Sequence, residues 1–277
     1  MRKPGVSYPV KPTTIKGYIY FLTIILTLAI PGISKAQNSW LDENGSSYKI
    51  HFKAKDKANE KEYRNLVDNG IKSVQLFFGN RFKKEFDVYV HPDHHSLDST
   101  WQKDWNMPTF KSECWMVASG IASKLDVISP ADWEKESCEH TYADKIKTQQ
   151  LITHELVHVY HGQLNTSPDF SNTSGIDWFV EGLATYASGQ CDRERITEVR
   201  KAIATNKITM KLDSFWTGNI KYGLSGSLVM YIDRKYGRDK LRELLKFNNK
   251  PEILTSLGTT EESLLADWKI YMTNEKQ

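Results

Sequence analysis

The chain contains 277 residues, of which 39% are hydrophobic and 26% are charged, and its formal net charge is +3. The first 36 residues contain five basic side chains and no acid, which leaves 32 basic against 34 acidic residues in the remainder. This balance, without a basic stripe, excludes nucleic acid as a partner. The remaining 241 residues are enough to bury the core of one domain.

Residues 1–36 are expected to be a signal peptide. Basic residues precede an apolar run at positions 18–30, whose 13 residues are too few for a typical membrane span. The small residues Ser34 and Ala36 predict cleavage before Gln37. Residues 37–277 are then expected to be a single secreted or periplasmic domain with no stable membrane association. Because the leading segment is long, an uncleaved membrane anchor is the alternative.

A small sheet is expected next, between about residues 47 and 130. Alternating or β-branched stretches predict strands, and one stretch of helical spacing lies among them. The strands are expected at 47–54, 86–91, 114–119 and 124–129, and the helix at 57–80. A turn or helix start is expected at 92–95. The nearby histidines His91, His94 and His95 have poor spacing for a metal site, and the segment is interpreted as a solvated loop.

The three cysteines are Cys114, Cys138 and Cys191. An exported protein can hold a disulfide, and an odd count leaves one thiol over. We expect Cys114 to pair with Cys138, because both flank the predicted strands that precede the next helix.

That helix is expected at 144–161 and contains the string His154-Glu155-Leu156-Val157-His158. Positions i and i+4 lie on one face of a helix, so the two imidazoles can share one metal ion. Two imidazoles suit zinc, and the adjacent Glu155 suits a general base acting on zinc-activated water. Apolar neighbours indicate a buried helix, in which these polar groups need partners. The alternative is a core helix with two hydrogen-bonded histidines.

A catalytic zinc ion needs a third protein ligand. One known continuation of the motif places Gly and His where this chain has His161 and Leu164, so that continuation fails. Glu181 lies 23 residues after His158 in a mostly apolar helical stretch. We expect it to complete the ligand set from an antiparallel helix.

The helix that carries Glu181 is expected to begin at Asp177, which would act as its cap. The small residues Gly182 and Ala184 would let this helix approach the helix at 144–161. Further helices are expected at 193–205, 222–236, 239–246 and 261–272. The pattern predicts an α+β fold, with a small mixed sheet followed by a helical part at about 144–275.

The two strings His154-Glu155-Leu156-Val157-His158 and Trp178-Phe179-Val180-Glu181-Gly182-Leu183-Ala184 resemble those of the gluzincin zinc metallopeptidases, most closely the peptidase MA-like domains. The resemblance implies a thermolysin-like (zincin) fold with the zinc site in a cleft between the sheet and the helices. It implies one Zn²⁺ on His154, His158 and Glu181, with Glu155 as the base. It also implies that an edge strand within 114–129 aligns the substrate backbone.

Two details of the resemblance bear on the reaction. The chain lacks the Gly-x-Met-Glu-Asn string of aminopeptidases in the wider clan, so an aminopeptidase is not supported. Tyr222 resembles a tyrosine that family members carry on the helix after the glutamate ligand, where it stabilises the oxyanion. Tyr160, Tyr186 and His161 are rivals for this role, and a buried core tyrosine is the alternative for Tyr222.

The sequence therefore predicts a secreted zinc-dependent metallopeptidase that hydrolyses peptide bonds in peptides or proteins. A zincin-fold binding module without catalysis is one alternative, although such a module has no need of Glu155. A membrane-tethered peptidase with an uncleaved anchor is another. The sequence does not predict the substrate, the cleavage specificity or the oligomeric state.

Overall fold

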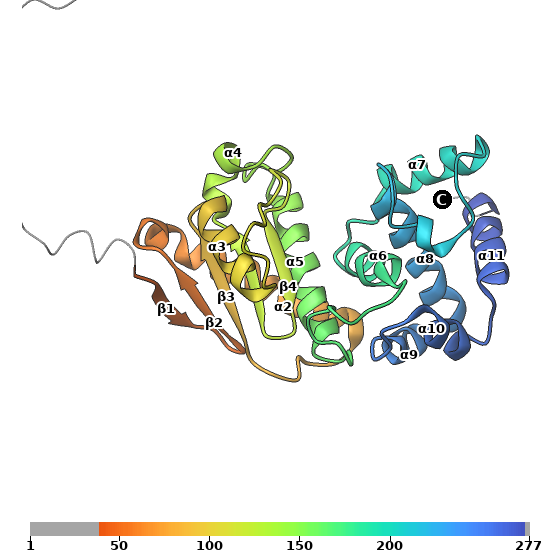
Figure 1. The fold of residues 1–277 in the computed structure, drawn as a ribbon, viewed down its shortest axis with the longest axis horizontal. Coiled ribbons are helices and arrows are strands. Elements are labelled where there is room, and N and C mark those ends of the chain that lie inside the picture. The colour runs from red at the N-terminus through yellow and green to blue at the C-terminus, as the bar shows by residue number, and fades with distance from the viewer. Residues whose placement is uncertain (1–38, 275–277) are drawn as a thin grey trace, which may run out of the picture.

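The computed structural model of the protein describes residues 39–274, and the expected signal peptide lies outside them. As predicted, a sheet comes first and a run of helices follows, which gives a mixed α+β fold (Figure 1). The helix that carries the two motif histidines packs beside the sheet, on the side that faces the other helices in this view. Over the described residues, no helix is both long and apolar enough to cross a membrane.

The sheet has five strands in the order β1-β2-β3-β5-β4. Their bounds are Leu41–Asn44 (β1), Tyr48–Phe52 (β2), Phe86–His91 (β3), Ala118–Ile121 (β4) and Lys124–Ile128 (β5). The central strands β2, β3 and β5 run parallel, and the edge strands β1 and β4 are antiparallel to their neighbours. The predicted mixed sheet is therefore correct. Strand β1 was not expected, and β4 begins four residues later than predicted.

Helices cover both faces of this sheet. Helix α2 (Glu60–Phe78) packs against α5 (Lys145–Gly162), and their apolar side chains meet Leu125 and Val127 of β5. Because side chains alternate along a strand, Asp126 points to the opposite face. There its carboxylate accepts a hydrogen bond from Trp101 in α3 (His94–Asp104). The short α4 (Trp133–Glu136) follows β5, and the 3₁₀ turns are η1 (Ala54–Asn59) and η2 (Pro130–Asp132).

Asp126 is the centre of a buried polar cluster under α3. Its carboxylate lies 3.1 Å from Nε2 of His91 and 2.7 Å from Nζ of Lys124. Burial would raise the pKa of Asp126, but the hydrogen bond from His91 and the charge of Lys124 lower it overall. His91 is fully buried, so the expected solvated loop is wrong for this residue. His94 instead contacts Ser112, so these histidines do not converge on a metal.

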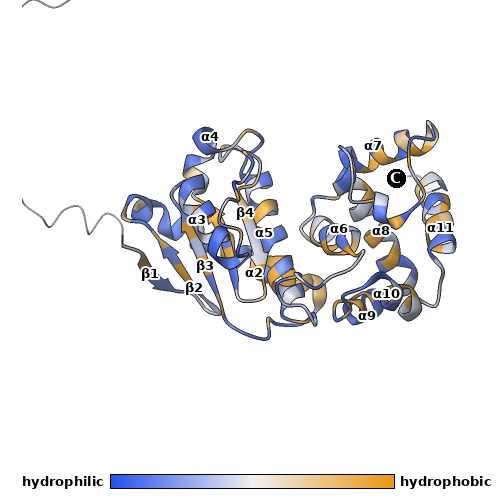
Figure 2. Cartoon of the chain, viewed as in Figure 1, coloured by the Kyte–Doolittle hydropathy of each residue, from blue (hydrophilic) through white to orange (hydrophobic). Residues whose placement is uncertain are grey.

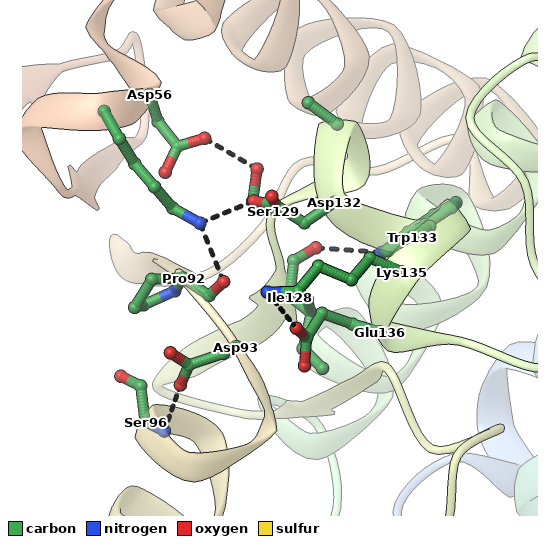
Figure 3. A network of polar contacts seen from close by, with 12 residues as sticks. Asp56, Pro92, Asp93, Ser96, Ile128, Ser129, Asp132, Trp133, Lys135 and Glu136 are labelled. Carbon is green, nitrogen blue, oxygen red and sulfur yellow. Dashed lines mark hydrogen bonds and ion pairs between the residues drawn. The ribbon is translucent and has the colours of Figure 1, made fainter.

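The carboxyl ends of the three parallel strands are joined by a second polar network (Figure 3). Ser129, after β5, donates a hydrogen bond to Asp56, after β2, at 2.6 Å. Lys55 donates to the carbonyl oxygen of Pro92, after β3, and forms an ion pair with Asp132. Ligands often bind at this edge of an open parallel sheet. Here the edge is filled by the protein's own side chains.

The helical part consists of six helices in the described chain. They are α6 (Asp177–Ala187), α7 (Arg193–Ala204), α8 (Lys221–Tyr236), α9 (Arg238–Leu244), α10 (Lys250–Leu257) and α11 (Glu261–Asn274), with a 3₁₀ turn, η3 (Leu212–Ser214), before α8. Helix α8 is buried from Gly223 to Asp233 and is the core of this part. Hydrophobic residues recur along α7 and α8, between hydrophilic ones (Figure 2).

One expectation about α6 is wrong, and a second is only partly correct, because α6 does pack against α5 but not through Gly182. Its N-cap is Ile176, and no side chain caps its first turn, so Asp177 is not the cap. Gly182 brings α6 close to α8 rather than to α5, because a Cβ at this position would lie 2.4 Å from the carbonyl oxygen of Ser225. The tight packing therefore joins the helix of Glu181 to the helix of Tyr222. Helix α10, which begins after a capping hydrogen bond from Glu252 N–H to the side chain of Asn249, was not expected.

Candidate metal centre

Helix α5 presents His154 and His158 on one face. The helix begins where the Asp144 carboxylate accepts a hydrogen bond from the backbone N–H of Lys147. It is buried along most of its length, and the side chains of Leu156 and Val157 are inaccessible to solvent. The two imidazoles are themselves buried, with exposed fractions of 6% each. Their polar atoms are therefore costly unless they meet partners.

The two imidazoles and the Glu181 carboxylate converge. The Nε2 atoms of His154 and His158 lie 3.1 Å apart, and Oε2 of Glu181 lies 3.4 Å from the first and 3.6 Å from the second. Ligand atoms about 2.1 Å from one tetrahedral zinc ion are about 3.4 Å from one another. This donor set fits zinc. It is the one cluster of three potential metal ligands found within residues 39–274.

The Glu181 carboxyl group is negatively charged at neutral pH, as a ligand for a metal cation should be. Burial would raise the pKa of this carboxyl, but the neighbouring His158 and His154 hold it well below its usual range. Glu181 is therefore ionised at neutral pH. Two imidazole nitrogens and one carboxylate oxygen are common zinc ligands in catalytic sites.

Gln190 orients one of the histidines, and the sequence analysis missed it. The Nδ1–H of His154 donates a hydrogen bond to Oε1 of Gln190 at 2.8 Å. This contact fixes the tautomer and leaves the Nε2 lone pair directed at Glu181 and His158. Gln190 follows α6 in a short turn and matches no motif, so no sequence signal identified it. The corresponding Nδ1 of His158 is buried and has no partner among the described residues.

Glu155 lies where the edge strand β4 crosses α5. A Cβ on Gly120 of β4 would lie 2.2 Å from the backbone carbonyl oxygen of Glu155 and 3.2 Å from Cβ of His158. Only glycine allows this approach. Burial raises the pKa of Glu155 to about 7, although its electrostatic interaction with His154 opposes this shift. The carboxyl can thus both take up and release a proton near neutral pH.

Tyr222, at the start of α8, lies beside the histidine pair. Its ring centroid is 6.3 Å from that of His154. Burial and the negative charges of Glu181 and Glu155 raise the pKa of Tyr222, so its hydroxyl keeps its proton at neutral pH. Tyr222 is therefore available as a hydrogen-bond donor next to the three converging side chains.

The three alternative donors have other contacts or lie away from His154. The hydroxyl of Tyr186 donates to Asp233 of α8 at 2.9 Å. The ring of Tyr160 is buried and stacks on Phe78, with centroids 4.5 Å apart. His161 is fully buried, and burial lowers its pKa to about 3, so it is neutral. None of these side chains has the position of Tyr222 beside His154.

The cysteines pair as expected, with a disulfide between Cys114 and Cys138. The bond joins the segment before β4 to the segment after α4. Cys191 is free, and burial raises the pKa of its thiol to about 12. A thiol of this kind is unreactive.

Comparison with protein-family models and with curated proteins finds no match. Solved structures do match. Native leukotriene A4 hydrolase from Saccharomyces cerevisiae has a TM-score of 0.50 and 14% identity, over 86% of this chain and 39% of that one. Another structure of native yeast LTA4 hydrolase has a TM-score of 0.49 and 13% identity, over 86% and 40%.

An M1 zinc metallopeptidase from Deinococcus radiodurans has a TM-score of 0.41 and 15% identity, over 85% of this chain and 52% of that one. The chain spans less than two thirds of the length of the protein in each of these three structures. The similarity to the first yeast structure shows that the two proteins share a fold.

Proposed function

We propose that this chain is an extracytoplasmic zinc metallopeptidase that hydrolyses peptide bonds in peptides or proteins. The observation that carries the proposal is the convergence of His154, His158 and Glu181 at separations of 3.1 to 3.6 Å, with Glu155 beside them. A binding module would not need a carboxyl group at Glu155, next to these three side chains. The fold shared with a protein named as a hydrolase is consistent with this reading.

In this proposal, His154, His158 and Glu181 hold one Zn²⁺. When bound, zinc polarises a carbonyl group and lowers the pKa of a coordinated water to about 7. Gln190 keeps His154 in the tautomer that leaves Nε2 free for the metal. Gly182 packs α6, which carries Glu181, closely against α8, which carries Tyr222.

Glu155 and Tyr222 carry the proton chemistry. Glu155 takes a proton from the attacking water at its carboxylate and returns it to the leaving nitrogen. The hydroxyl of Tyr222 donates a hydrogen bond to the carbonyl oxygen as negative charge develops there. The outer edge of β4 is free of any strand partner in the described chain, and there it can pair with an extended peptide. Gly120 brings this edge within reach of Glu155.

Export of the chain is part of the same proposal. Residues 1–36 have the pattern of a signal peptide, and the Cys114–Cys138 disulfide suits an oxidising compartment. Sequencing the amino terminus of the mature protein tests this step. A start at Gln37 supports cleavage, and an intact leader supports a membrane-tethered peptidase instead.

The enzyme proposal is tested with purified protein, by elemental analysis and by cleavage of a peptide library. Wild type should hold one zinc ion per chain, and His154→Ala and Glu181→Ala should lose it. Glu155→Gln should retain zinc and lose turnover. The exposed His95 and Glu198 supply matched controls, since His95→Ala and Glu198→Gln should retain both.

Two results would refute parts of this assignment. Stoichiometric zinc in His154→Ala or Glu181→Ala would show that the ligand set is wrong. Zinc binding without cleavage of any peptide in the library would favour the alternative of a binding module.

A further inference from the structure

Next to the candidate metal centre, Lys221 is enclosed by three aromatic rings. Its Nζ lies 4.5 Å from the ring centroid of Trp216, 5.2 Å from that of Trp115 and 5.3 Å from that of Tyr222. The rings come from both parts of the protein, since Trp115 precedes β4 and the other two lie at or just before the start of α8. Such contacts hold an ammonium group in place.

This ammonium is close to the reacting groups. Tyr222 is the shared neighbour, because its ring contacts both Lys221 and His154. An extended peptide advances about 3.5 Å per residue. A substrate bound at the metal centre therefore reaches Lys221 within a few residues of the bond to be cleaved.

Lys221 lacks an anionic partner. An ammonium group has three N–H donors, and aromatic faces are not hydrogen-bond acceptors of the usual kind. Within residues 39–274, Lys221 Nζ has neither an ion pair nor a hydrogen bond with another side chain or backbone group. The similarly half-buried Lys250, by contrast, pairs with Asp213 and Glu261. Lys221 is only partly buried, and the N–H donors of its ammonium group are available to a ligand.

A second cation lies on the same tyrosine. The guanidinium of Arg195 is 5.7 Å from the ring centroid of Tyr222, and its Nη1 donates to the backbone carbonyl oxygen of Gln190. Arg195 likewise has no carboxylate within ion-pair distance in the described part of the chain. Two positive charges that flank Tyr222 offset the carboxylates of Glu155 and Glu181 and favour an incoming anion.

We infer that Lys221, held by Trp115, Trp216 and Tyr222, binds a carboxylate of the peptide substrate within about three residues of the scissile bond. The inference rests on the proposed peptidase function and specifies its substrate class as peptides with an acidic group near the cleavage point. The carboxylate belongs either to the C-terminus or to an Asp or Glu side chain. Both sources present the same two oxygens to the ammonium group.

Peptide binding to zinc-loaded Glu155→Gln protein, measured by calorimetry, tests the inference without turnover. Three peptides of one sequence are compared: an amidated neutral peptide, its free-acid form, and an amidated form with one Gln replaced by Glu. At least one acidic peptide should bind about tenfold more tightly than the neutral one, as expected for one charge-assisted hydrogen bond. The free-acid form identifies the C-terminus as the source, and the Glu form identifies a side chain.

Substitution of Lys221 tests whether this residue causes the preference for acidic peptides. Lys221→Met should reduce the tenfold ratio to about one, and Lys221→Arg should restore part of it. Lys207→Met, at an exposed lysine after α7, should keep the ratio. Zinc content and melting temperature establish that each variant is folded.

The outcomes separate this inference from the function it rests on. Equal binding of the three peptides, or an acid preference that survives Lys221→Met, overturns the inference. If the wild-type enzyme still cleaves the neutral peptide in that case, the peptidase proposal stands without it. An acid preference in a protein that cleaves none of the three would contradict the peptidase proposal and leave a carboxylate-binding site.

Discussion

Removal of the Gln190 side chain should weaken zinc binding although this residue is not a proposed ligand. The amide oxygen accepts the Nδ1–H of His154 at 2.8 Å, and the His154 side chain is only 8% exposed. In Gln190→Ala the imidazole loses the contact that fixes its tautomer and its ring orientation. Loss of such a partner typically lowers metal affinity by about 10- to 100-fold, or about 1.4 to 2.7 kcal/mol.

Competition with a chromophoric chelator at neutral pH measures this change. Gln190→Glu keeps an acceptor in the same place and adds charge, so it should hold zinc at least as tightly as wild type. Gln75→Ala, at a half-buried glutamine on α2, should leave the affinity unchanged. If Gln190→Ala keeps zinc within about threefold of wild type, the orienting role is refuted.

Three further changes should have measurable effects. Gly120→Ala forces β4 away from the carbonyl oxygen of Glu155, so it should lower the free energy of unfolding by about 1–3 kcal/mol and reduce turnover, both measured on one preparation. Burial would raise the pKa of Asp126, but its histidine and lysine partners lower it overall. The ionised carboxylate therefore stabilises the folded state fully at pH values above about 3.9, the pKa of Asp in an unfolded chain. This contribution is lost as the pH falls through the pKa of Asp126 in the folded protein. The free energy of unfolding in urea should therefore fall less below about pH 5 in Asp126→Asn than in wild type. Reduction of the Cys114–Cys138 bond, which spans 24 residues, should lower the free energy of unfolding by about 3 kcal/mol.

Each of these predictions can fail clearly. Wild-type stability and turnover in Gly120→Ala would show that β4 can move without consequence. Equal acid sensitivity of wild type and Asp126→Asn would remove this carboxyl from the acid transition. An unchanged unfolding curve in the double Cys→Ser variant would show that the loop closed by the disulfide is already ordered without it.

The elements that the sequence predicted are those with strong periodicity. Helices α2, α5 and α8 and strand β3 lie within one to three residues of their expected bounds, because each has a continuous buried face. Strand β1 has one leucine followed by three polar residues and is mostly exposed, so its pairing with β2 has no local sequence pattern to mark it. Helix α10 has eight residues, of which only Ile253 and Leu257 are buried, which is too few for a clear period.

The same difference applies to the site. His154, Glu155 and His158 belong to one short sequence motif, and Glu181 belongs to a second one, so the sequence identified them as candidates. Gln190 and the rings around Lys221 are brought to the site by tertiary packing. The ring of Trp115, which contacts Lys221, lies 106 positions earlier in the chain, and sequence spacing does not predict such a contact.

The division of the three potential metal ligands between α5 and α6 makes the candidate metal centre depend on the packing of these two helices. Two nitrogens belong to the sheet part and the carboxylate belongs to the helical part, so neither part alone presents three donors. In an unfolded chain the three side chains are not held together, so the candidate metal centre is not formed. If a metal ion binds to all three side chains, its binding energy should also stabilise the contact between the two parts of the fold.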